Sequence, residues 1–373
     1  MSMIVGVPSE VKDSERRVSL QPDGAYELTH HGHRLLVQSG AGAGAGFSDE
    51  EYLAAGAEVL PSAKEVFDEA ELIVKVKEPI PSEYDLFREG HKLFTYLHLA
   101  ADKELTQFLM DKKVDSIAYE TVQLEDGSLP LLTPMSEVAG RMSVQAAAHS
   151  LENTSGGAGL LLGGVPGTPA ARVTIMGGGV VGTEAAKIAV GMRAVVRVMD
   201  INPKRLAYLS DIFAGRVDLV TPNRARTAAY VAESDVVIGA VLVAGARAPK
   251  LVTTEMISSM REGSVAVDVA IDQGGCIETA RPTTHSAPTY IEQGVVHYCV
   301  ANIPGAVART STLALTSATM PYLIRIADKG MQEAAQEDRA LWRGLSTMGG
   351  RLVSEPVAAA HGLECGVPQK ERV

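Results

Sequence analysis

The sequence predicts an α/β protein built from two doubly wound lobes. Apolar runs rich in β-branched residues alternate with helix-like segments, and the alternation forms two successive sets. The length of 373 residues allows two domains with separate hydrophobic cores. A long apolar-rich helical pattern after residue 309 needs a partner surface, so we expect the chain to return to the first domain.

The first third of the chain contains the first set. Five apolar runs are predicted to be strands of a parallel sheet, at residues 4–7, 34–38, 72–76, 93–97 and 116–122. Helix patterns lie between them at 22–30, 49–55, 63–70 and 102–111. This βαβ rhythm predicts a sheet with helices on both faces.

The second set contains six predicted strands, at residues 173–176, 195–199, 217–220, 236–240, 265–271 and 295–300. A helix is expected from Ser136, as N-cap after Pro134, to about residue 151, and a return helix at 309–327. The predicted domains are therefore 1–135 plus 309–373 and, between them, 136–308. Two long connecting helices would form a hinge beside an inter-lobe cleft, or would serve only as packing struts.

The most specific motif follows the strand at 173–176. Gly177, Gly179 and Gly182 fit G-x-G-x-x-G, and a helix pattern follows at 183–190. In this fingerprint the first glycine allows a tight turn, the second lets backbone approach a pyrophosphate, and the third lets helix and strand pack closely. The helix start offers N–H groups and a positive dipole end to phosphates. The second lobe is therefore predicted to be a Rossmann-like dinucleotide domain rather than another α/β domain with a glycine-rich turn.

Asp200 indicates which dinucleotide binds. It closes the predicted strand at 195–199, 18 residues past Gly182, where a carboxylate can accept hydrogen bonds from both ribose hydroxyls. The same carboxylate would repel a 2′-phosphate. The predicted cofactor is NAD rather than NADP.

The composition is typical of a soluble enzyme. The net charge is −11 and no long basic run exists, which argues against a nucleic-acid partner. The apolar stretch at 236–246 is too short to span a bilayer, and the N-terminus lacks the plan of a signal peptide. Three cysteines at positions 276, 299 and 365 have neither metal-site spacing nor the number for a disulfide framework. We expect a cytoplasmic protein without a membrane partner.

Candidate catalytic residues follow the predicted strands, because ligands of doubly wound sheets bind outside the carboxyl ends. Lys75 or Lys77 ends one strand and His98 another, although a histidine in an apolar run is often a core residue. Arg17 could bind a carboxylate through its guanidinium fork or form a surface salt bridge. In the second lobe, Asp272 is a strand-end carboxylate followed by two glycines, whereas Asp268 lies inside the apolar strand and is expected to be structural.

These residues form a coherent set around a nicotinamide. Arg17 and Lys77 would bind a substrate carboxylate and polarise the adjacent carbonyl. His98 would exchange a proton with substrate, and Asp272 would activate water or ammonia, while hydride passes to or from the cofactor. The set predicts oxidative deamination of a small 2-amino acid or reduction of a 2-oxo acid.

The same residues carry a resemblance to the alanine dehydrogenase family that extends to about Leu363. The matching motifs are Glu15-Arg16-Arg17-Val18, Lys75-Val76-Lys77-Glu78-Pro79, Leu97-His98-Leu99-Ala100, Tyr119-Glu120-Thr121, Met135-Ser136-Glu137-Val138-Ala139-Gly140, Ala270-Ile271-Asp272-Gln273-Gly274-Gly275, Cys299-Val300-Ala301-Asn302-Ile303-Pro304 and Thr310-Ser311-Thr312. The resemblance implies reversible, NAD-dependent conversion of L-alanine and water to pyruvate and ammonia by a hexamer of two-lobed subunits. It implies substrate binding by Arg17 and Lys77 and catalysis by His98 and Asp272.

The resemblance also implies the cofactor contacts. Besides the three glycines, they are Ser136, Val180, Asp200, Arg205, Val241, Leu242, Val269, Ala270, Ile271, Arg281, Ala301, Asn302, Ile303 and Pro304. Some family members hold a metal through a Glu and a His in the helix after Pro321. Arg325 and Lys329 stand at those positions here, so no metal is expected.

Three alternatives share the scaffold. They are the nucleotide-binding subunit of a proton-translocating transhydrogenase, a saccharopine-type dehydrogenase, and an NAD-sensing module without catalysis. The four polar residues Arg17, Lys77, His98 and Asp272 argue against the first and the last, since neither needs a substrate pocket. The motif resemblance favours alanine over saccharopine chemistry.

Overall fold

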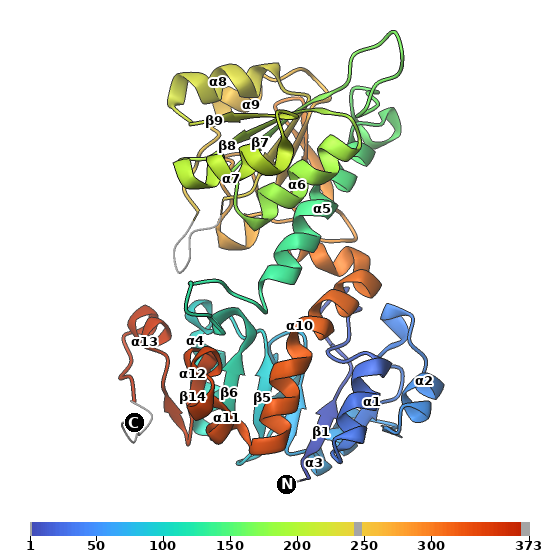
Figure 1. The fold of residues 1–373 in the computed structure, drawn as a ribbon, viewed down its shortest axis with the longest axis vertical. Coiled ribbons are helices and arrows are strands. Elements are labelled where there is room, and N and C mark those ends of the chain that lie inside the picture. Colours follow the sequence, from blue (N-terminus) through green and yellow to red (C-terminus); the bar gives the residue numbers. More distant parts are fainter. Residues whose placement is uncertain (1, 242–247, 367–373) are drawn as a thin grey trace. The chain divides into compact units, whose positions relative to one another are not determined.

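A computed structural model describes residues 2–241 and 248–366, so the expected cofactor contact Leu242 lies outside the described residues. The chain divides into two units, Met1–Met135 with Val307–Val373 (unit 1) and Ser136–Ala306 (unit 2). Each unit contains one sheet with its own cover of helices (Figure 1).

The sheet of unit 1 has the strand order β15-β14-β6-β5-β4-β1-β2-β3. Its strands are β1 (Ile4–Val7), β2 (Arg34–Gln38), β3 (Glu58–Leu60), β4 (Leu72–Val74), β5 (Lys92–Thr95), β6 (Asp115–Ala118), β14 (Leu345–Met348) and β15 (Arg351–Leu352). The first six are parallel, whereas β14 and β15 pair antiparallel at the edge. The prediction of a purely parallel sheet is therefore wrong at this edge, which the C-terminal segment supplies.

The helices of unit 1 follow the expected alternation. They are α1 (Pro22–His30), α2 (Asp49–Ala54), α3 (Ala63–Glu69), α4 (Lys103–Asp111), α10 (Ala308–Lys329), α11 (Met331–Glu337), α12 (Arg339–Gly344) and α13 (Glu355–His361), with 3₁₀ helices η1 (Ala43–Ala45), η2 (Pro81–Leu86), η3 (Leu99–Ala101) and η4 (Tyr119–Thr121). Ser48 begins α2 with a capping box, and Asp102 caps α4. The apolar faces of α3, α4 and α13 share one core cluster with β4 and β5. The long helix α10 lies beside α1 (Figure 1).

The sheet of unit 2 has the strand order β12-β13-β11-β10-β7-β8-β9. From β13 to β9 this order matches that of β6 to β3 in unit 1. The strands are β7 (Arg172–Met176), β8 (Val195–Met199), β9 (Val217–Val220), β10 (Val236–Gly239), β11 (Val265–Asp268), β12 (Thr289–Glu292) and β13 (Val295–Tyr298). The edge strand β12 is antiparallel and was not expected. In both units the order reverses beside the first strand, which is the point where doubly wound sheets bind ligands.

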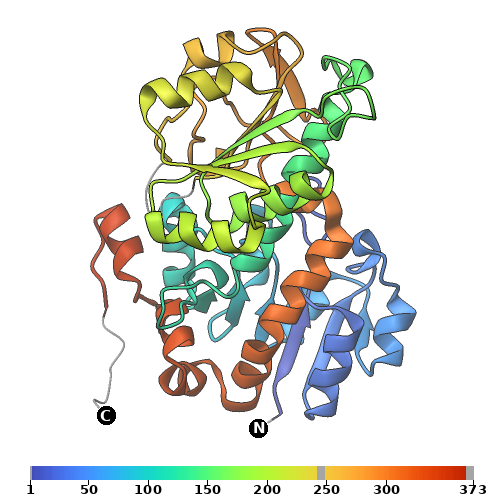
Figure 2. The same ribbon diagram turned by 45° about the horizontal axis from the view of Figure 1, so that its top comes forward.

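Two layers of helices cover the sheet of unit 2. They are α5 (Thr133–Ser150), α6 (Val180–Gly191), α7 (Pro203–Phe213), α8 (Arg224–Glu233) and α9 (Thr254–Ser258), with 3₁₀ helices η5 (Asn153–Ser155), η6 (Ile271–Gln273) and η7 (Ile303–Val307). Val173 and Ile175 of β7 pack with α5, α6 and α7, whereas Met176 packs with α8 and α9 on the other face. Figure 2 shows α6 and α7 on one side of the strands and α8 and α9 on the other.

Several predicted strands end earlier than their apolar patterns. Residues 75–76, 96–97, 119–122 and 269–271 were expected to be strand but form loops or 3₁₀ helix. The N–H groups of Val76 and Leu97 donate to the carboxylates of Glu10 and Glu120, so side chains replace the strand partner at these ends. A hydropathy pattern does not show where a side-chain carboxylate takes the place of a neighbouring strand.

Helix α5 begins at Thr133, so the expectation that Ser136 is its N-cap is wrong. Pro134 lies within the first turn, where a fixed φ and a missing N–H are favourable, so it starts the helix rather than preceding it. Similarly, α6 begins at Val180, three residues before the predicted start. None of the described helices has the length and apolar character needed to cross a membrane.

Candidate active site

The glycine loop of unit 2 forms a cradle beside the point where the strand order reverses. Gly177 follows β7 and Val241 follows the neighbouring strand β10, on the two sides of that point. Gly179 is the N-cap of α6, so the helix begins directly at the loop. The free N–H groups and the positive end of the helix dipole therefore point out of this edge of the sheet, as a phosphate site requires.

The three glycines differ in what a side chain would meet. Gly177 has a φ of +102°, and a Cβ there would lie 2.8 Å from the carbonyl oxygen of Ala240. A Cβ on Gly182 would lie 1.8 Å from the carbonyl oxygen of Gly177, so only glycine lets α6 pack this close. Around Gly179 nothing lies within 4 Å of the Cβ position. The loop is thus crowded on the protein side and open where a pyrophosphate would approach, which fits the cofactor expected there.

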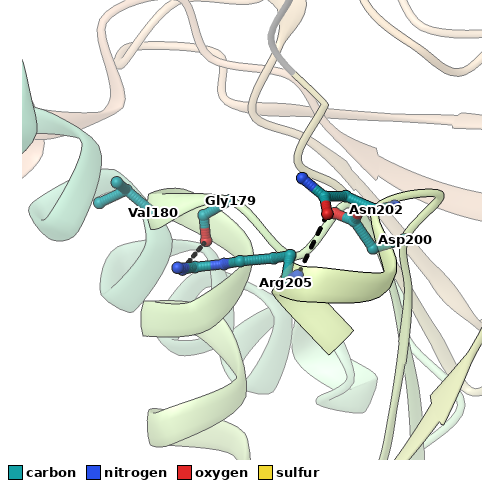
Figure 3. A pocket seen from close by; sticks show the side chains of 5 residues that line it. All are labelled: Gly179, Val180, Asp200, Asn202 and Arg205. Carbon is teal, nitrogen blue, oxygen red and sulfur yellow. Dashed lines mark hydrogen bonds between the residues drawn. The ribbon is translucent and has the colours of Figure 1, made fainter. Parts of the chain in front are cut away.

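Asp200 and Arg205 complete this cradle (Figure 3). The carboxylate of Asp200 accepts hydrogen bonds from the N–H groups of Gly178 and Asn202, both at 2.7 Å. A carboxylate offers about four acceptor positions, so capacity remains for ribose hydroxyls. The guanidinium of Arg205 folds over the loop and donates to the carbonyl oxygens of Gly178 and Gly179 and, at 2.6 Å, to the hydroxyl of Thr183. A cavity of about 330 Å³ is lined by Gly179, Val180, Asp200, Asn202 and Arg205.

The other expected cofactor contacts of unit 2 occupy several elements. Ser136 lies on α5, and Val269 and Ala270 link β11 to Ile271 in η6. The segment after β13 contains Ala301, Asn302, Ile303 and Pro304. The guanidinium of Arg281 covers the ring of Tyr290 on β12 at 3.8 Å, and its backbone N–H donates to the hydroxyl of that tyrosine at 2.9 Å.

The two aspartates near β11 have different environments. Asp268 is fully buried and accepts from the N–H groups of Ala270 and Ile277 at 3.1 and 2.9 Å. Burial raises its pKa, against the effect of these bonds. Asp272 is exposed in η6, and its carboxylate accepts from the N–H of Asn302 at 3.4 Å. Asp268 thus orders the loop, whereas the carboxylate of Asp272 is exposed.

In unit 1, Arg17 is buried rather than placed in a surface salt bridge. Only 2% of the residue is exposed, and its Nε and Nη2 atoms donate to the two oxygens of Glu15 at 2.7 and 2.5 Å. Its Nη1 donates to the sulfur of Met135 at 3.2 Å. Burial alone lowers the pKa of Arg17, but the hydrogen bonds and charge of Glu15 outweigh it and raise that pKa. The expected fork is therefore directed to Glu15, which fixes the guanidinium plane.

The two lysines after β4 have separate roles. Lys75 is fully buried and contacts Glu83 at 2.6 Å and Glu10 at 3.4 Å. Lys77 is half-buried, and its N–H donates to Glu10 at 3.3 Å. Burial raises the pKa of Glu10 even though the charge of Lys75 opposes it. Lys75 is thus part of the buried network, which leaves Lys77 as the lysine nearer the surface.

His98 is not a core residue, so that alternative is wrong. It follows β5, and 47% of its side chain is exposed. Its ring stacks on that of Tyr96, with the centroids 5.9 Å apart and the planes within 4°. Its backbone has a φ of +50°, in the left-handed region that residues other than glycine seldom adopt.

The charges of Lys77 and His98 both act on the carboxyl group of Glu78. Burial raises the pKa of Glu78, but Lys12, Lys77 and His98 outweigh burial and hold that pKa below its usual value. In the sheet, β4 lies between β1 and β5. Arg17 follows β1, Lys77 follows β4 and His98 follows β5, so the three residues belong to segments that leave the carboxyl ends of adjacent strands. The structure therefore gathers a guanidinium, an ammonium and an imidazole at the carboxyl ends of neighbouring strands.

Sequence reasoning missed the acidic partners of this group. Glu10, Glu15 and Glu120 accept hydrogen bonds from the backbone N–H groups of these residues, and the last two lie within the family motifs. The residue type alone did not mark these glutamates as the acceptors of these hydrogen bonds, because a glutamate is most often a surface residue. In α10, Arg325 forms an ion pair with Asp338 and Lys329 one with Glu337, so both cations have acidic partners.

The fold and the site together define a class of protein. It is a two-unit α/β protein with a glycine-rich loop of the dinucleotide-binding type. Family models place the chain more narrowly: "Alanine dehydrogenase/PNT, N-terminal domain" matches residues 6–139 and "Alanine dehydrogenase/PNT, C-terminal domain" matches residues 143–355. The chain belongs to the alanine dehydrogenase/PNT family.

Individual relatives agree with this assignment. The chain is 58% identical over 362 residues to an alanine dehydrogenase of Methanococcus maripaludis and 54% identical over 363 residues to alanine dehydrogenase 2 of Staphylococcus aureus, covering 97% of each chain in both cases. A solved structure of an L-alanine dehydrogenase superposes with a TM-score of 0.94 at 53% identity, covering 96% of this chain and 99% of that one. A transhydrogenase from Sinorhizobium meliloti superposes with a TM-score of 0.80 at 27% identity, covering 94% and 99%.

Proposed function

We propose that this chain is an NAD-dependent L-alanine dehydrogenase. It would convert L-alanine, NAD⁺ and water to pyruvate, ammonia, NADH and a proton, and would catalyse the reverse reaction. The observation that carries the proposal is the set of Arg17, Lys77 and His98 at adjacent strand ends of unit 1, in a chain whose unit 2 has an open glycine cradle. A protein that only bound the dinucleotide would not need the first set.

Each residue of unit 1 has a defined part in the proposal. Arg17 and Lys77 supply two positive charges for the carboxylate shared by alanine and pyruvate. Glu15 fixes the plane of Arg17, so less freedom is lost when substrate binds. The half-exposed ring of His98 gives a proton to, or takes one from, the substrate amino or carbonyl group.

Unit 2 would hold the cofactor and one carboxylate for catalysis. The N–H groups of the loop that contains Gly177, Gly179 and Gly182 would donate to the pyrophosphate. The carboxylate of Asp200 would accept from the hydroxyls of the adenosine ribose. When bound, NAD supplies the acceptor or donor of the hydride. Asp272, exposed in η6, would activate the water that attacks during deamination or the ammonia that attacks in the reverse reaction. We further infer a hexamer, as the family resemblance implies, and a cytoplasmic location, as the few cysteines favour.

The first test is NAD reduction, followed by absorbance, with L-alanine as substrate. Lysine with 2-oxoglutarate tests saccharopine chemistry, and a thio-nicotinamide acceptor with NADH tests hydride exchange between nicotinamides, as in a transhydrogenase. We expect turnover only with alanine. Turnover with either of the other pairs, and none with alanine, would reject the proposal.

His98→Ala tests the mechanism. We expect kcat to fall by about 10²–10⁴-fold, the usual contribution of a positioned acid–base group, with NADH affinity unchanged. Asp272→Asn should act likewise, since it keeps the shape and removes the base. Near-normal turnover of folded His98→Ala protein would end the catalytic assignment.

Asp200→Ala tests the choice of cofactor. Loss of the carboxylate should weaken NAD binding and relax the discrimination against NADP, because the repulsion of a 2′-phosphate is removed. Asp211→Ala is the matched control, since Asp211 is an exposed acid on the neighbouring helix α7. If the unaltered enzyme already used NADP as well as NAD, the role given to Asp200 would be incorrect.

A further inference from the structure

The three functional residues of unit 1 share a local device. Each donates its backbone N–H to a glutamate carboxylate: Arg17 to Glu15 at 3.0 Å, Lys77 to Glu10 at 3.3 Å, and His98 to Glu120 at 2.6 Å. The shortest of the three bonds belongs to the residue that would transfer the proton.

Glu120 lies in η4, directly after β6, which is the strand next to β5. Only 15% of its side chain is exposed. Its Oε1 accepts from His98 at 2.6 Å and from Leu97 at 3.3 Å, while Oε2 accepts from Leu97 at 3.2 Å. One carboxylate thus binds two successive N–H groups at the point where β5 ends.

The conformation of His98 requires such a restraint. A non-glycine residue with positive φ persists only when its surroundings hold it there. The carbonyl oxygen of His98 accepts from the N–H of Ala101 at 3.0 Å, which begins η3, and its N–H is held by Glu120. Both polar groups of the His98 backbone are therefore bonded, and the turn directs the ring onto Tyr96.

We propose that Glu120 is a positioning residue for His98. By accepting its N–H at 2.6 Å, Glu120 holds the left-handed turn that presents the imidazole. Its Oε1 also lies 3.9 Å from the Nδ1 of that ring, which is too far for a hydrogen bond, so the backbone bond, set by the reach of the side chain, is the restraint. This proposal rests on the proposed function, since it concerns the residue assigned to proton transfer there.

Two conservative variants separate the effect of the length of the Glu120 side chain from the effect of its charge. Glu120→Gln loses the charge but keeps a carbonyl oxygen at the same reach, whereas Glu120→Asp keeps the charge and shortens the side chain by one methylene. We expect Glu120→Asp to lower kcat for alanine by about 10- to 100-fold, the cost of small misplacements of a reacting group, with the KM for NAD unchanged. Glu120→Gln should stay within a few-fold of the unaltered enzyme.

Glu125→Asp and Glu125→Gln are the matched controls. Glu125 lies a few residues further along the chain, is 81% exposed and pairs with Arg339 at the surface. Neither change should alter kcat, KM or the thermal midpoint. Equal effects at positions 120 and 125 would show a nonspecific consequence of the substitutions and would overturn the proposal.

Amide hydrogen exchange of the peptide that contains residues 97 and 98 gives a readout independent of activity. We expect faster exchange in Glu120→Asp and near-unaltered exchange in Glu120→Gln. The reverse order in exchange and kcat, or unchanged values in both variants, would overturn the proposal. If the unaltered enzyme oxidises alanine and only the Glu120 variants disagree, the positioning role fails; if the unaltered enzyme does not oxidise alanine, the proposed function fails.

Discussion

At the scale of single residues, unit 1 combines buried charges with an exposed imidazole. Arg17 and Glu15 form a two-bond pair that is almost fully buried. Removing one partner of a buried pair is costly because it leaves the other charge unpaired. The guanidinium therefore has a structural role as well as the proposed role in binding, and a test at this position has to separate the two.

Arg17→Lys makes that separation. Lysine keeps the charge but cannot bond both oxygens of Glu15, because its ammonium has no planar fork. We expect the KM for pyruvate to rise by about 10-fold or more, the loss of one charge-assisted hydrogen bond, with the KM for NADH nearly unchanged. Steady-state kinetics and a melting curve on one preparation check this. Equal losses for pyruvate and NADH would mean that Arg17 serves the fold alone.

The buried imidazole of His91 makes the stability of the fold depend on pH. It is fully buried; its Nδ1 accepts from the N–H of Arg88 at 3.1 Å and its Nε2 lies 3.0 Å from the carbonyl oxygen of Phe67. Burial, then the charge of Arg88, lower its pKa from 6.5 to about 4. The unfolded chain therefore binds a proton at higher pH than the folded one, so this stability is complete above pH 6.5 and is lost as the pH falls towards 4.

His91→Asn tests this dependence, since asparagine can still accept from Arg88 but does not titrate. We expect the thermal midpoint of the variant to be lower at neutral pH and to fall less steeply between pH 6.5 and 4 than that of the unaltered protein. His149→Asn, at a side chain that is 72% exposed, should leave the slope unchanged. Parallel slopes for the His91 variant and the unaltered protein would contradict the assignment.

At the scale of elements, the position of each strand end decides what the loops can do. Helix α6 can begin at the loop only because Gly182 lets it approach the carbonyl oxygen of Gly177. Likewise, α5 packs against α6 where a Cβ on Gly140 would lie 2.3 Å from the carbonyl oxygen of Val181. Glycines thus set the spacing of two helices around the cradle.

Gly182→Ala therefore should shift α6 away from β7. We expect a lower thermal midpoint and weaker NADH binding, measured by fluorescence titration, because the new Cβ meets backbone that cannot rotate away. Gly191→Ala is the control in the same helix: nothing lies within 4 Å of its Cβ position, and alanine favours helix by about 0.5–1 kcal/mol over glycine. Normal NADH affinity in Gly182→Ala would show that close packing is not needed for the site.

At the scale of the whole molecule, the two units differ in how they use the chain. Unit 2 is continuous, and its core clusters come from one stretch of sequence. Unit 1 needs both ends, because β14 completes its sheet beside β6 and α10 packs beside α1. A unit that comes from one continuous stretch of chain can be produced as a separate fragment, whereas a discontinuous unit cannot.

A fragment of residues 136–306 should therefore fold alone and bind NADH, whereas a fragment of residues 1–135 should not fold. Cooperative melting followed by circular dichroism, with NADH titration of the first fragment, checks both expectations. A cooperative transition of fragment 1–135 would show that the C-terminal segment is dispensable for the fold of unit 1.

The sequence by itself determined the two α/β sets, the glycine cradle and the strands that Arg17, Lys77, His98 and Asp272 follow, but not the residues at which several of those strands end. These features depend on local periodicity and on residues with special backbone conformations, which sequence records directly. Only the tertiary structure decided the antiparallel edges β12, β14 and β15, the burial of Arg17 against Glu15, and the contact between Glu120 and His98. Each of these joins elements that the chain pattern does not pair, or depends on which way a side chain turns, and both are settled by packing rather than by local preference.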